Sequence, residues 1–344
     1  MATEVVPAAL KKGDTIAFVS PSSRCNDIFL AATNRAKSHF ESLGFKVNEI
    51  FTSPLSSDFH ERTLQRCAEL HAAFSDPEVK CVLCTSGGTT SNELVRHLDY
   101  DLIKKNPKIF CGYSDITILH YALYTQCGLR TFYGPTAIGE FGEAPSPDSF
   151  TTDHFLRVLT GEGAGPVPRS LQWTTEPPDF FVSGDSSMKA RTMRPTPPWR
   201  WLRPGTASAP LIGGCLTILM RVKGTKFWPS HKGTILLLEN AMGEGADLPI
   251  PVQRTASFMA DMGNVGVWDD IVGLVIGRPY AYDEKMSVEF RKMVLEQCSG
   301  TSFPILVDVD VGHTSPMVTL PLNGMVKLDS KADEFSILEK GVVS

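Results

Sequence analysis

Residues 79–88 read VKCVLCTSGG, a largely apolar run that opens directly into a Ser-Gly-Gly turn. An apolar run of this length followed by a turn is typical of a strand buried on both faces of a sheet. Similar runs occur at residues 14–20 (DTIAFVS) and 109–111 (IFC), and helix-like stretches occur at residues 28–43 and 61–74. This alternation predicts an α/β fold, with a doubly wound parallel sheet covered by helices on both faces.

The composition changes after residue 140, where prolines become frequent and little regular structure is expected as far as residue 205. Beyond that stretch, Leu211–Cys215 (LIGGC) is expected to be a glycine-rich entry into a helix, followed by further strands. We therefore predict three segments. They are an N-terminal α/β domain with the candidate nucleophile (1–165), a Pro-rich linker and substrate loop (166–205), and a smaller α/β C-terminal domain (206–344).

Composition and charge narrow the class of protein. The chain has 344 residues, of which 42% are hydrophobic and 21% charged, as expected for a globular protein of about two domains. The formal net charge of −5 argues against a nucleic acid polymer as partner, because phosphate binding needs a basic excess. No apolar stretch approaches the ~18 residues of a membrane span, and the first residues lack a signal-peptide pattern. Eight cysteines without an export signal predict reduced thiols in a cytoplasmic protein.

Residues 110–117 (FCGYSDIT) predict a strand, a sharp turn and the start of a helix. Ser114 at this turn is similar to a nucleophile elbow, although the later glycine of the G-x-S-x-G form is missing. The alternative is that Ser114 only caps the following helix. Gly87 and Gly88 fall at the end of a neighbouring strand, where a backbone N–H would stabilise an oxyanion or the glycines would simply form a turn.

Two later strands also end in residues that carry chemistry. Glu239 ends the apolar run ILLLE, and His313 follows the strand at residues 305–309 in a loop that reads GHTSP. Each residue has a plain alternative, since a carboxylate at a strand end is often a surface residue and a loop histidine is often solvated. Together they would supply the orienting acid and the base of a catalytic triad.

The cysteines do not form a site in this interpretation. Cys81 and Cys84 have C-x-x-C spacing, but residues three apart on a strand point to opposite faces, so we read them as core thiols and expect no metal. Cys111 would be the nucleophile of a cysteine-type amidotransferase only if it occupied the elbow, and it lies three residues before Ser114.

The ordered set of these segments resembles the LD-carboxypeptidase family of serine peptidases, in particular its microcin C self-immunity branch. The segments run along nearly the whole chain. They are KKGDTIAFVSPSS (11–23), CTSGGTTSNEL (84–94), DYDLIKKNPKIFCGYSDIT (99–117), TFYGP (131–135), LIGGCL (211–216), ILLLEN (235–240) and DVDVGHTSPMVTLPL (308–322).

The resemblance implies a role for each candidate residue. Ser114 would be the nucleophile, His313 the base and Glu239 its partner, with backbone N–H groups of Gly88 and Asp115 in the oxyanion hole. It also implies a serine hydrolase that needs no cofactor, acts on a small-molecule or peptide substrate and forms a homodimer. Two positions depart from the family pattern, since Ser315 replaces the acidic residue of G-H-T-D-P and Asn323 the glycine of P-L-G.

Substrate contacts are predicted from Gly87 and from the sequence PPWRWL, which is similar to the tryptophan-bearing loop of the immunity branch. Trp199 or Trp201 would stack on a nucleobase, and the alternative is that they pack the loop onto the protein body. We expect an aminoacyl- or peptidyl-nucleotide of the microcin C type as substrate. The alternatives are a cell-wall tetrapeptide, cleaved by an LD-carboxypeptidase, and a catalytically silent module that binds a small ligand.

Overall fold

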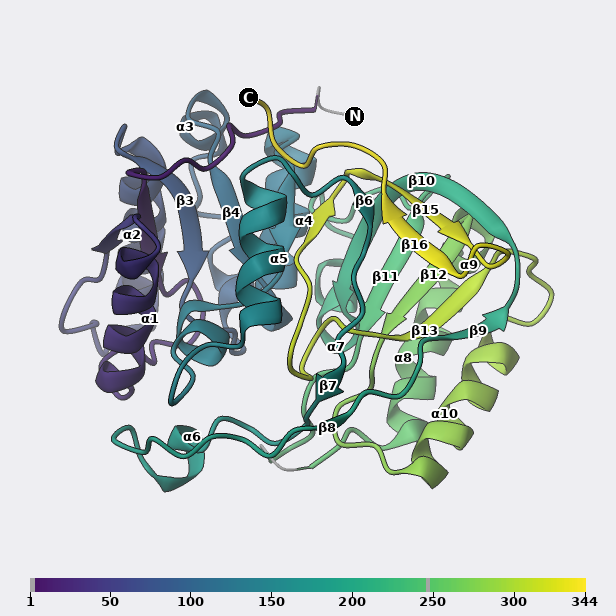
Figure 1. Cartoon of the computed structure of the whole chain (residues 1–344). Helices are drawn as coiled ribbons and strands as arrows, with labels where there is room; N and C mark the ends of the chain where they lie inside the picture. The colour runs from purple at the N-terminus through teal and green to yellow at the C-terminus, as the bar shows by residue number, and fades with distance from the viewer. Residues whose placement is uncertain (1–3, 246–247) are drawn as a thin grey trace.

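The computed structural model describes residues 4–245 and 248–344 and contains two sheets that lie side by side (Figure 1). The first sheet has six strands in the order β14-β5-β4-β3-β1-β2. Its strands are β1 (Thr15–Val19), β2 (Lys46–Glu49), β3 (Val79–Cys84), β4 (Ile109–Gly112), β5 (Thr131–Tyr133) and β14 (Leu320–Leu322). All neighbours are parallel except β14, which runs antiparallel to β5.

Helices cover both faces of this sheet, which confirms the doubly wound prediction. The helices are α1 (Leu30–Ser42), α2 (Phe59–Ser75), α3 (Tyr100–Lys105), α4 (Thr117–Cys127) and α5 (Ser149–Leu159). Helices α1 and α5 pack Phe40 and Phe155 against one face, while α2, α3 and α4 pack against the other. Short helices at strand ends complete this half. They are η1 (Ser91–Glu93), η2 (Ser114–Ile116) and the π-helix η3 (Ala137–Phe141).

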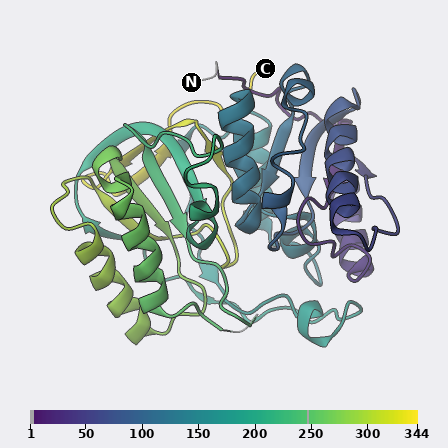
Figure 2. The same cartoon turned by 180° about the vertical axis from the view of Figure 1, so that it is seen from behind.

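The second sheet has eight strands in the order β6-β16-β15-β10-β11-β12-β13-β9. Its strands are β6 (Gly165–Pro166), β9 (Arg200–Arg203), β10 (Thr206–Cys215), β11 (Ile235–Glu239), β12 (Gly273–Gly277), β13 (Ile305–Val309), β15 (Met325–Asp329) and β16 (Glu334–Ile337). The helices of this half are α7 (Leu216–Leu219), η4 (Met220–Val222), α8 (Val252–Asn264), α9 (Val267–Asp270) and α10 (Glu284–Gln297). Helices α8 and α10 lie together on one face of the sheet (Figure 2).

The glycine-rich segment Leu211–Cys215 leads into helix α7, which begins at Leu216, but the segment itself is the second half of strand β10, which the sequence did not predict. Gly213 explains the pattern, since a Cβ at this position would lie 1.9 Å from the carbonyl oxygen of Leu237 on β11. The glycines therefore allow a close backbone approach within the sheet, and the helix starts only at Leu216.

The Pro-rich stretch is an excursion from the second half that reaches across to the first (Figure 1). It contains the two-stranded pair β7 (Gln172–Trp173) and β8 (Arg194–Pro195), and between them the short helix α6 (Phe180–Ser183). The division of the chain between the two sheets is not sequential. Strand β14 comes late in the chain but belongs to the first sheet, and β6 and β9, at either end of the Pro-rich stretch, belong to the second sheet.

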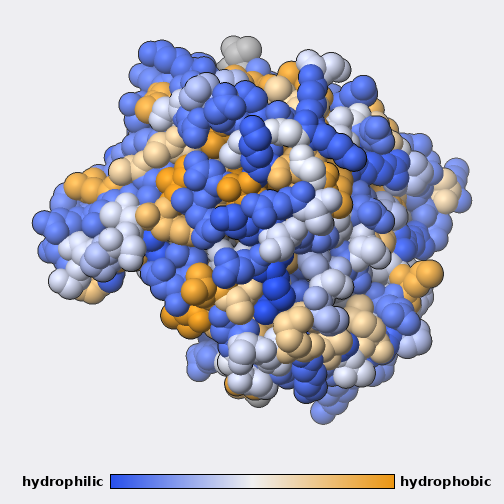
Figure 3. All heavy atoms as spheres, turned by 60° about the vertical axis from the view of Figure 1, so that its left-hand side comes forward, coloured by the Kyte–Doolittle hydropathy of each residue, from blue (hydrophilic) through white to orange (hydrophobic). Residues whose placement is uncertain are grey.

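None of the helices in the described part of the chain is long and apolar enough to cross a membrane. The face shown in Figure 3 is mostly hydrophilic and carries scattered hydrophobic patches.

Candidate active site

Ser114 stands in a strained turn between strand β4 and helix η2. Its φ is +62°, a left-handed conformation that non-glycine residues rarely adopt and that is characteristic of nucleophile elbows. Neither η2 nor α4 receives a side-chain capping bond at its N-terminus. The capping alternative is therefore not what the structure shows, and the hydroxyl instead lies 3.0 Å from Nε2 of His313.

His313 is held between the serine and a buried carboxylate. Its Nδ1 lies 2.6 Å from Oε2 of Glu239, and the histidine side chain is only 6% exposed. Glu239 is the last residue of β11, and His313 lies in the loop after β13. Parallel strands of the second sheet bring Glu239 and His313 to one edge, and the packing of the two sheets side by side places that edge against Ser114 of the first sheet, 199 positions from His313.

Glu239 is fully enclosed by polar and glycine partners. The hydroxyl of Tyr133 donates to its Oε1 at 2.6 Å and also accepts a hydrogen bond from the backbone N–H of Ser114. A Cβ at Gly312 would lie 2.6 Å from Glu239 Oε2, so only glycine fits beside the carboxylate. Burial by itself would raise the pKa of Glu239, but the interaction with His313 and the hydrogen bonds outweigh it and keep the pKa below its usual range.

The Ser-Gly-Gly turn after β3 lies against the serine. A Cβ built on Gly87 would be 2.8 Å from Cβ and 3.0 Å from Oγ of Ser114, and 3.5 Å from the backbone nitrogen of Asp115. Gly88 has a φ of +145°, a conformation that favours glycine. The structure thus brings the turn and the N-terminus of η2 together on either side of the candidate nucleophile.

A cleft of about 390 Å³ opens over Ser114 and His313. Its floor is formed by the strand ends, and one wall comes from the Pro-rich excursion. Residues of that wall include Glu176, Pro177, Pro178, Phe181 and Arg191. The positive charge of Arg191 is compensated by an ion pair with Glu143. The carboxylates of Glu140 and Glu176 therefore give the described cleft lining a net negative charge.

Neither predicted substrate-binding tryptophan reaches this cleft. Trp199 is 5% exposed, donates from Nε1 to Oδ2 of Asp310 at 2.9 Å and belongs to the hydrophobic core. Trp201 is half-buried on β9 and donates to Asp333 at 2.8 Å. Because neither side chain lines the cleft and both are held by bonds to carboxylates of the second half, the structure contradicts the stacking prediction and favours the alternative, in which the tryptophans pack the loop.

The two departures from the family pattern are accommodated. Ser315 Oγ accepts a hydrogen bond from Arg191 at 2.7 Å, and its backbone pairs with Thr174 through two hydrogen bonds. Asn323 takes a φ of +68°, which asparagine tolerates better than most residues, so it can stand where glycine is common. Ser315 thus ties the histidine loop to the Pro-rich excursion.

Several polar residues of the site were not predicted from the sequence. Tyr133 orients Glu239, and Tyr113 donates to Glu140 at 2.9 Å while its ring packs edge-on against His313 at 5.0 Å. Arg191 lies in the least regular part of the chain. The position of Tyr133 at the end of β5 offered a signal, whereas nothing local indicated the partners of Arg191.

The structure shows where the cysteines considered in the sequence analysis lie. Cys81 and Cys84 are buried, free and in two different core clusters, which places them on opposite faces of the sheet as expected. Burial raises the pKa of Cys111 well above its ordinary value, and the thiol lies in β4 rather than in the elbow. The described residues contain no cluster of three or more side chains that could hold a metal ion.

A serine in a strained turn, hydrogen-bonded to a histidine that a buried glutamate orients, is the arrangement found in serine hydrolases. Family models agree with this class. Residues 16–134 match the LD-carboxypeptidase N-terminal domain and residues 208–328 match the LD-carboxypeptidase C-terminal domain. The chain belongs to the LD-carboxypeptidase family and is a hydrolase of that family.

Curated relatives are similar over almost the whole chain. A putative carboxypeptidase, YocD, from Bacillus subtilis strain 168 is 32% identical, with 93% of this chain and 95% of that protein covered. The microcin C7 self-immunity protein MccF from Escherichia coli is 30% identical, with coverage of 98% and 96%.

Solved structures support the fold. A complex of the microcin C7 self-immunity protein MccF with aspartyl sulfamoyl adenosine has a TM-score of 0.88 at 26% identity, covering 98% of this chain and 99% of that one. An MccF-like protein from Bacillus anthracis has a TM-score of 0.85 at 30% identity, with coverage of 97% and 99%.

Proposed function

We propose that the protein cleaves an amide bond by a serine mechanism in which Ser114, His313 and Glu239 form the triad. Ser114 Oγ attacks the carbonyl carbon while His313 Nε2 takes the hydroxyl proton and later passes it to the leaving nitrogen. Glu239 holds the Nδ1–H tautomer and stabilises the imidazolium that forms. Water then hydrolyses the acyl-enzyme. The observation that carries this proposal is the continuous hydrogen-bonded chain from Ser114 to Glu239.

The tetrahedral oxyanion would be met by backbone N–H groups of Gly88 and Asp115. One such donor contributes on the order of 3 kcal/mol to transition-state stabilisation in serine hydrolases. Support comes from the contact between the Gly87–Gly88 turn and the serine side chain, and from the position of Asp115 in the first turn of η2. Gly87 would also contact substrate, because it lines the cleft.

Aminoacyl nucleotides are the substrate class that we favour. Relatives of known structure, similar over 98% of this chain, hold aspartyl sulfamoyl adenosine and glutamyl sulfamoyl guanosine. The acidic cleft lining suits a substrate that carries a free amino group, since Glu140 and Glu176 both face the cavity. Neither tryptophan lines the cleft, and the most exposed aromatic side chain among its described lining residues is Phe181, which is 39% exposed. We assign the base-stacking role to Phe181.

Cleavage of a cell-wall tetrapeptide is the second candidate. A probable murein peptide carboxypeptidase of Bacillus subtilis is 29% identical over 98% of this chain. A peptide with a free carboxylate needs a cationic partner, however, and Arg191 is already paired with Glu143. This charge arrangement favours the nucleotide over the tetrapeptide.

The test presents pure enzyme with a panel of aminoacyl-sulfamoyl nucleotides and L,D-tetrapeptides, and products are followed by mass. We expect cleavage of the nucleotide conjugates at the carboxamide bond. Cleavage of tetrapeptides alone would mean that the substrate is a cell-wall peptide, and the proposed serine mechanism would still stand. No cleavage of any member, together with tight ligand binding, would indicate the silent binding module. The expected homodimer is tested separately, from the mass in solution.

A further inference from the structure

Arg66 is a buried arginine of helix α2 that the proposed mechanism does not use. It is 2% exposed, donates to Oγ1 of Thr90 at 2.6 Å and forms an ion pair with Glu93. The same guanidinium donates to the carbonyl oxygen of Pro21 at 3.3 Å and to that of Ser22 at 3.4 Å. Arg66 therefore joins the loop that follows β1 to the loop that follows β3.

These two loops meet at the glycine turn. The backbone N–H of Ser23 donates to the carbonyl oxygen of Gly87 at 3.1 Å. A Cβ at Gly88 would lie 2.5 Å from Oγ of Ser22 and 2.2 Å from Oγ of Ser23, so the turn packs in direct contact with the loop that follows β1. Any shift of that loop is thus transmitted to the backbone that would bind the oxyanion.

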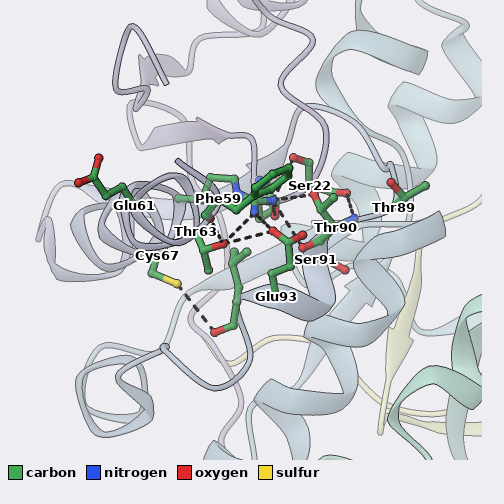
Figure 4. Close-up of polar contacts among 12 residues, drawn as sticks. Ser22, Phe59, Glu61, Thr63, Cys67, Thr89, Thr90, Ser91 and Glu93 are labelled. Carbon is green, nitrogen blue, oxygen red and sulfur yellow. Dashed lines mark hydrogen bonds and ion pairs between the residues drawn. The ribbon is translucent and has the colours of Figure 1, made fainter. Parts of the chain in front are cut away.

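The second proposed oxyanion donor is the backbone N–H of Asp115, and the Asp115 side chain bonds to the same two loops. Its Oδ2 accepts from Oγ of Ser22 at 2.6 Å and from the backbone N–H of Ser91 at 2.8 Å, and the residue is completely buried. Figure 4 shows Ser22, Thr90 and Ser91 close together, with Glu93 between them and Thr63 of α2. One carboxylate and one guanidinium thus brace the two backbone segments that flank Ser114.

We propose that Arg66 is a positioning residue for the oxyanion hole, acting through Thr90 and the β1 loop on the Gly87–Gly88 turn. This inference rests on the proposed function. Arginine suits the task because its planar fork of five donors can hold several acceptors in fixed directions, which lysine cannot do. Small displacements matter here, since a misplacement of about 1 Å in a catalytic arrangement can cost roughly a hundredfold in rate.

The competing interpretation is that Arg66 only stabilises the domain. Arg130 provides a matched control, because it is a 3% exposed arginine paired with two carboxylates, those of Glu4 and Glu339, and none of the three residues lines the cleft. A purely structural role predicts that R66M and R130M behave alike. A positioning role predicts that only R66M slows the chemistry.

The experiment measures the rate of Ser114 labelling by a fluorophosphonate, and kcat and KM on the best panel substrate, for R66M, T90V, R66K and R130M. We expect kcat and the labelling rate of R66M to fall roughly tenfold to a hundredfold with KM within about threefold. T90V removes one acceptor from Arg66 and should lower kcat and the labelling rate about three- to tenfold. This variant keeps the proposal testable if R66M does not fold. R66K should recover only part of the loss.

Amide hydrogen exchange gives a readout of position rather than of activity. In R66M, and not in R130M, residues 86–91 should exchange faster. If Ser114 of the wild type is labelled but R66M and T90V keep full rate and protection, the positioning role is overturned and the proposed function stands. If Ser114 of the wild type is not labelled, the proposed function falls, and this inference falls with it.

Discussion

The candidate active site and the Pro-rich excursion that covers it are built in opposite ways. Glu239 is 1% exposed at the end of a fully buried strand, whereas Phe181 is 39% exposed on a helix of four residues. The residues that would break the bond are therefore fixed by two packed sheets. Phe181 and Glu176, which would contact the rest of the substrate, are carried by a segment with little core of its own.

A few defined contacts hold the excursion in place. The carboxylate of Asp185 accepts from the backbone N–H groups of Ala31 and Ala32, at the start of α1, where the N-cap residue makes no side-chain bond. Phe180 packs edge-on against Phe29 at 5.6 Å. Mutations at strand ends should therefore affect the chemical step, whereas mutations on the excursion should affect substrate binding.

The largest effect is expected from E239Q. A glutamine cannot hold the required tautomer of His313 or stabilise the imidazolium, so kcat should fall by about 10⁴-fold with little change in thermal stability. Steady-state kinetics on the best panel substrate measures this.

The milder variant Y133F removes one hydrogen bond to Glu239. It should move the acid limb of the pH–rate profile to higher pH, because that bond helps keep the pKa of Glu239 low.

Loss of only a few-fold in E239Q would mean that the carboxylate has a structural role. Equal loss in Y133F and E239Q would show that the geometry of the carboxylate, rather than its charge, dominates.

W199A tests whether the tryptophan packs or binds substrate. Removing a buried tryptophan typically costs about 3–5 kcal/mol of folding stability, and it would also leave Asp310 without one of its donors. We expect a lower midpoint of urea unfolding and no selective rise of KM for nucleotides. A stable variant with a KM raised only for nucleotide substrates would restore the stacking hypothesis.

F181A should act on substrate binding. Base stacking on an aromatic side chain contributes about 1–3 kcal/mol, which corresponds to a rise of KM by roughly tenfold to a hundredfold with kcat little changed. Val182 is the matched control, because it is the next residue, is 71% exposed and does not line the cleft. If V182A and F181A give the same KM, Phe181 does not stack on the substrate.

The smallest effect concerns pH and the buried His154. Burial lowers its pKa to about 4, and its Nδ1 accepts a hydrogen bond from the backbone N–H of Thr319, which requires the neutral ring. Since the unfolded chain takes up the proton near pH 6.5, stability is lost as pH falls from about 6.5 to 4, by about 1 kcal/mol per pH unit for this group. Urea unfolding of wild type and H154Q at pH 7 and pH 5 should show a smaller loss in the variant. Equal losses would assign the pH dependence to other groups.

The sequence was informative about where the candidate residues lie. Ser114, Glu239 and His313 each stand at or just after the end of an apolar strand, and the structure places these ends within hydrogen-bond distance of one another. It was misleading at β10, because the glycines that let the strand approach Leu237 also weaken the strand signal. It also failed at Trp199, whose partner Asp310 lies 111 residues further along the chain and leaves no local trace.

The proposed mechanism requires that Ser114 is a nucleophile activated by His313. The most direct measurement is the mass of the intact protein after treatment with a serine-directed fluorophosphonate, followed by peptide mapping, for the wild type, S114A and H313Q. We predict a single adduct on Ser114 in the wild type, none in S114A, and labelling slowed by several orders of magnitude in H313Q, with all three proteins folded. An unlabelled wild type, or an adduct that persists in S114A, would mean that Ser114 is not the nucleophile.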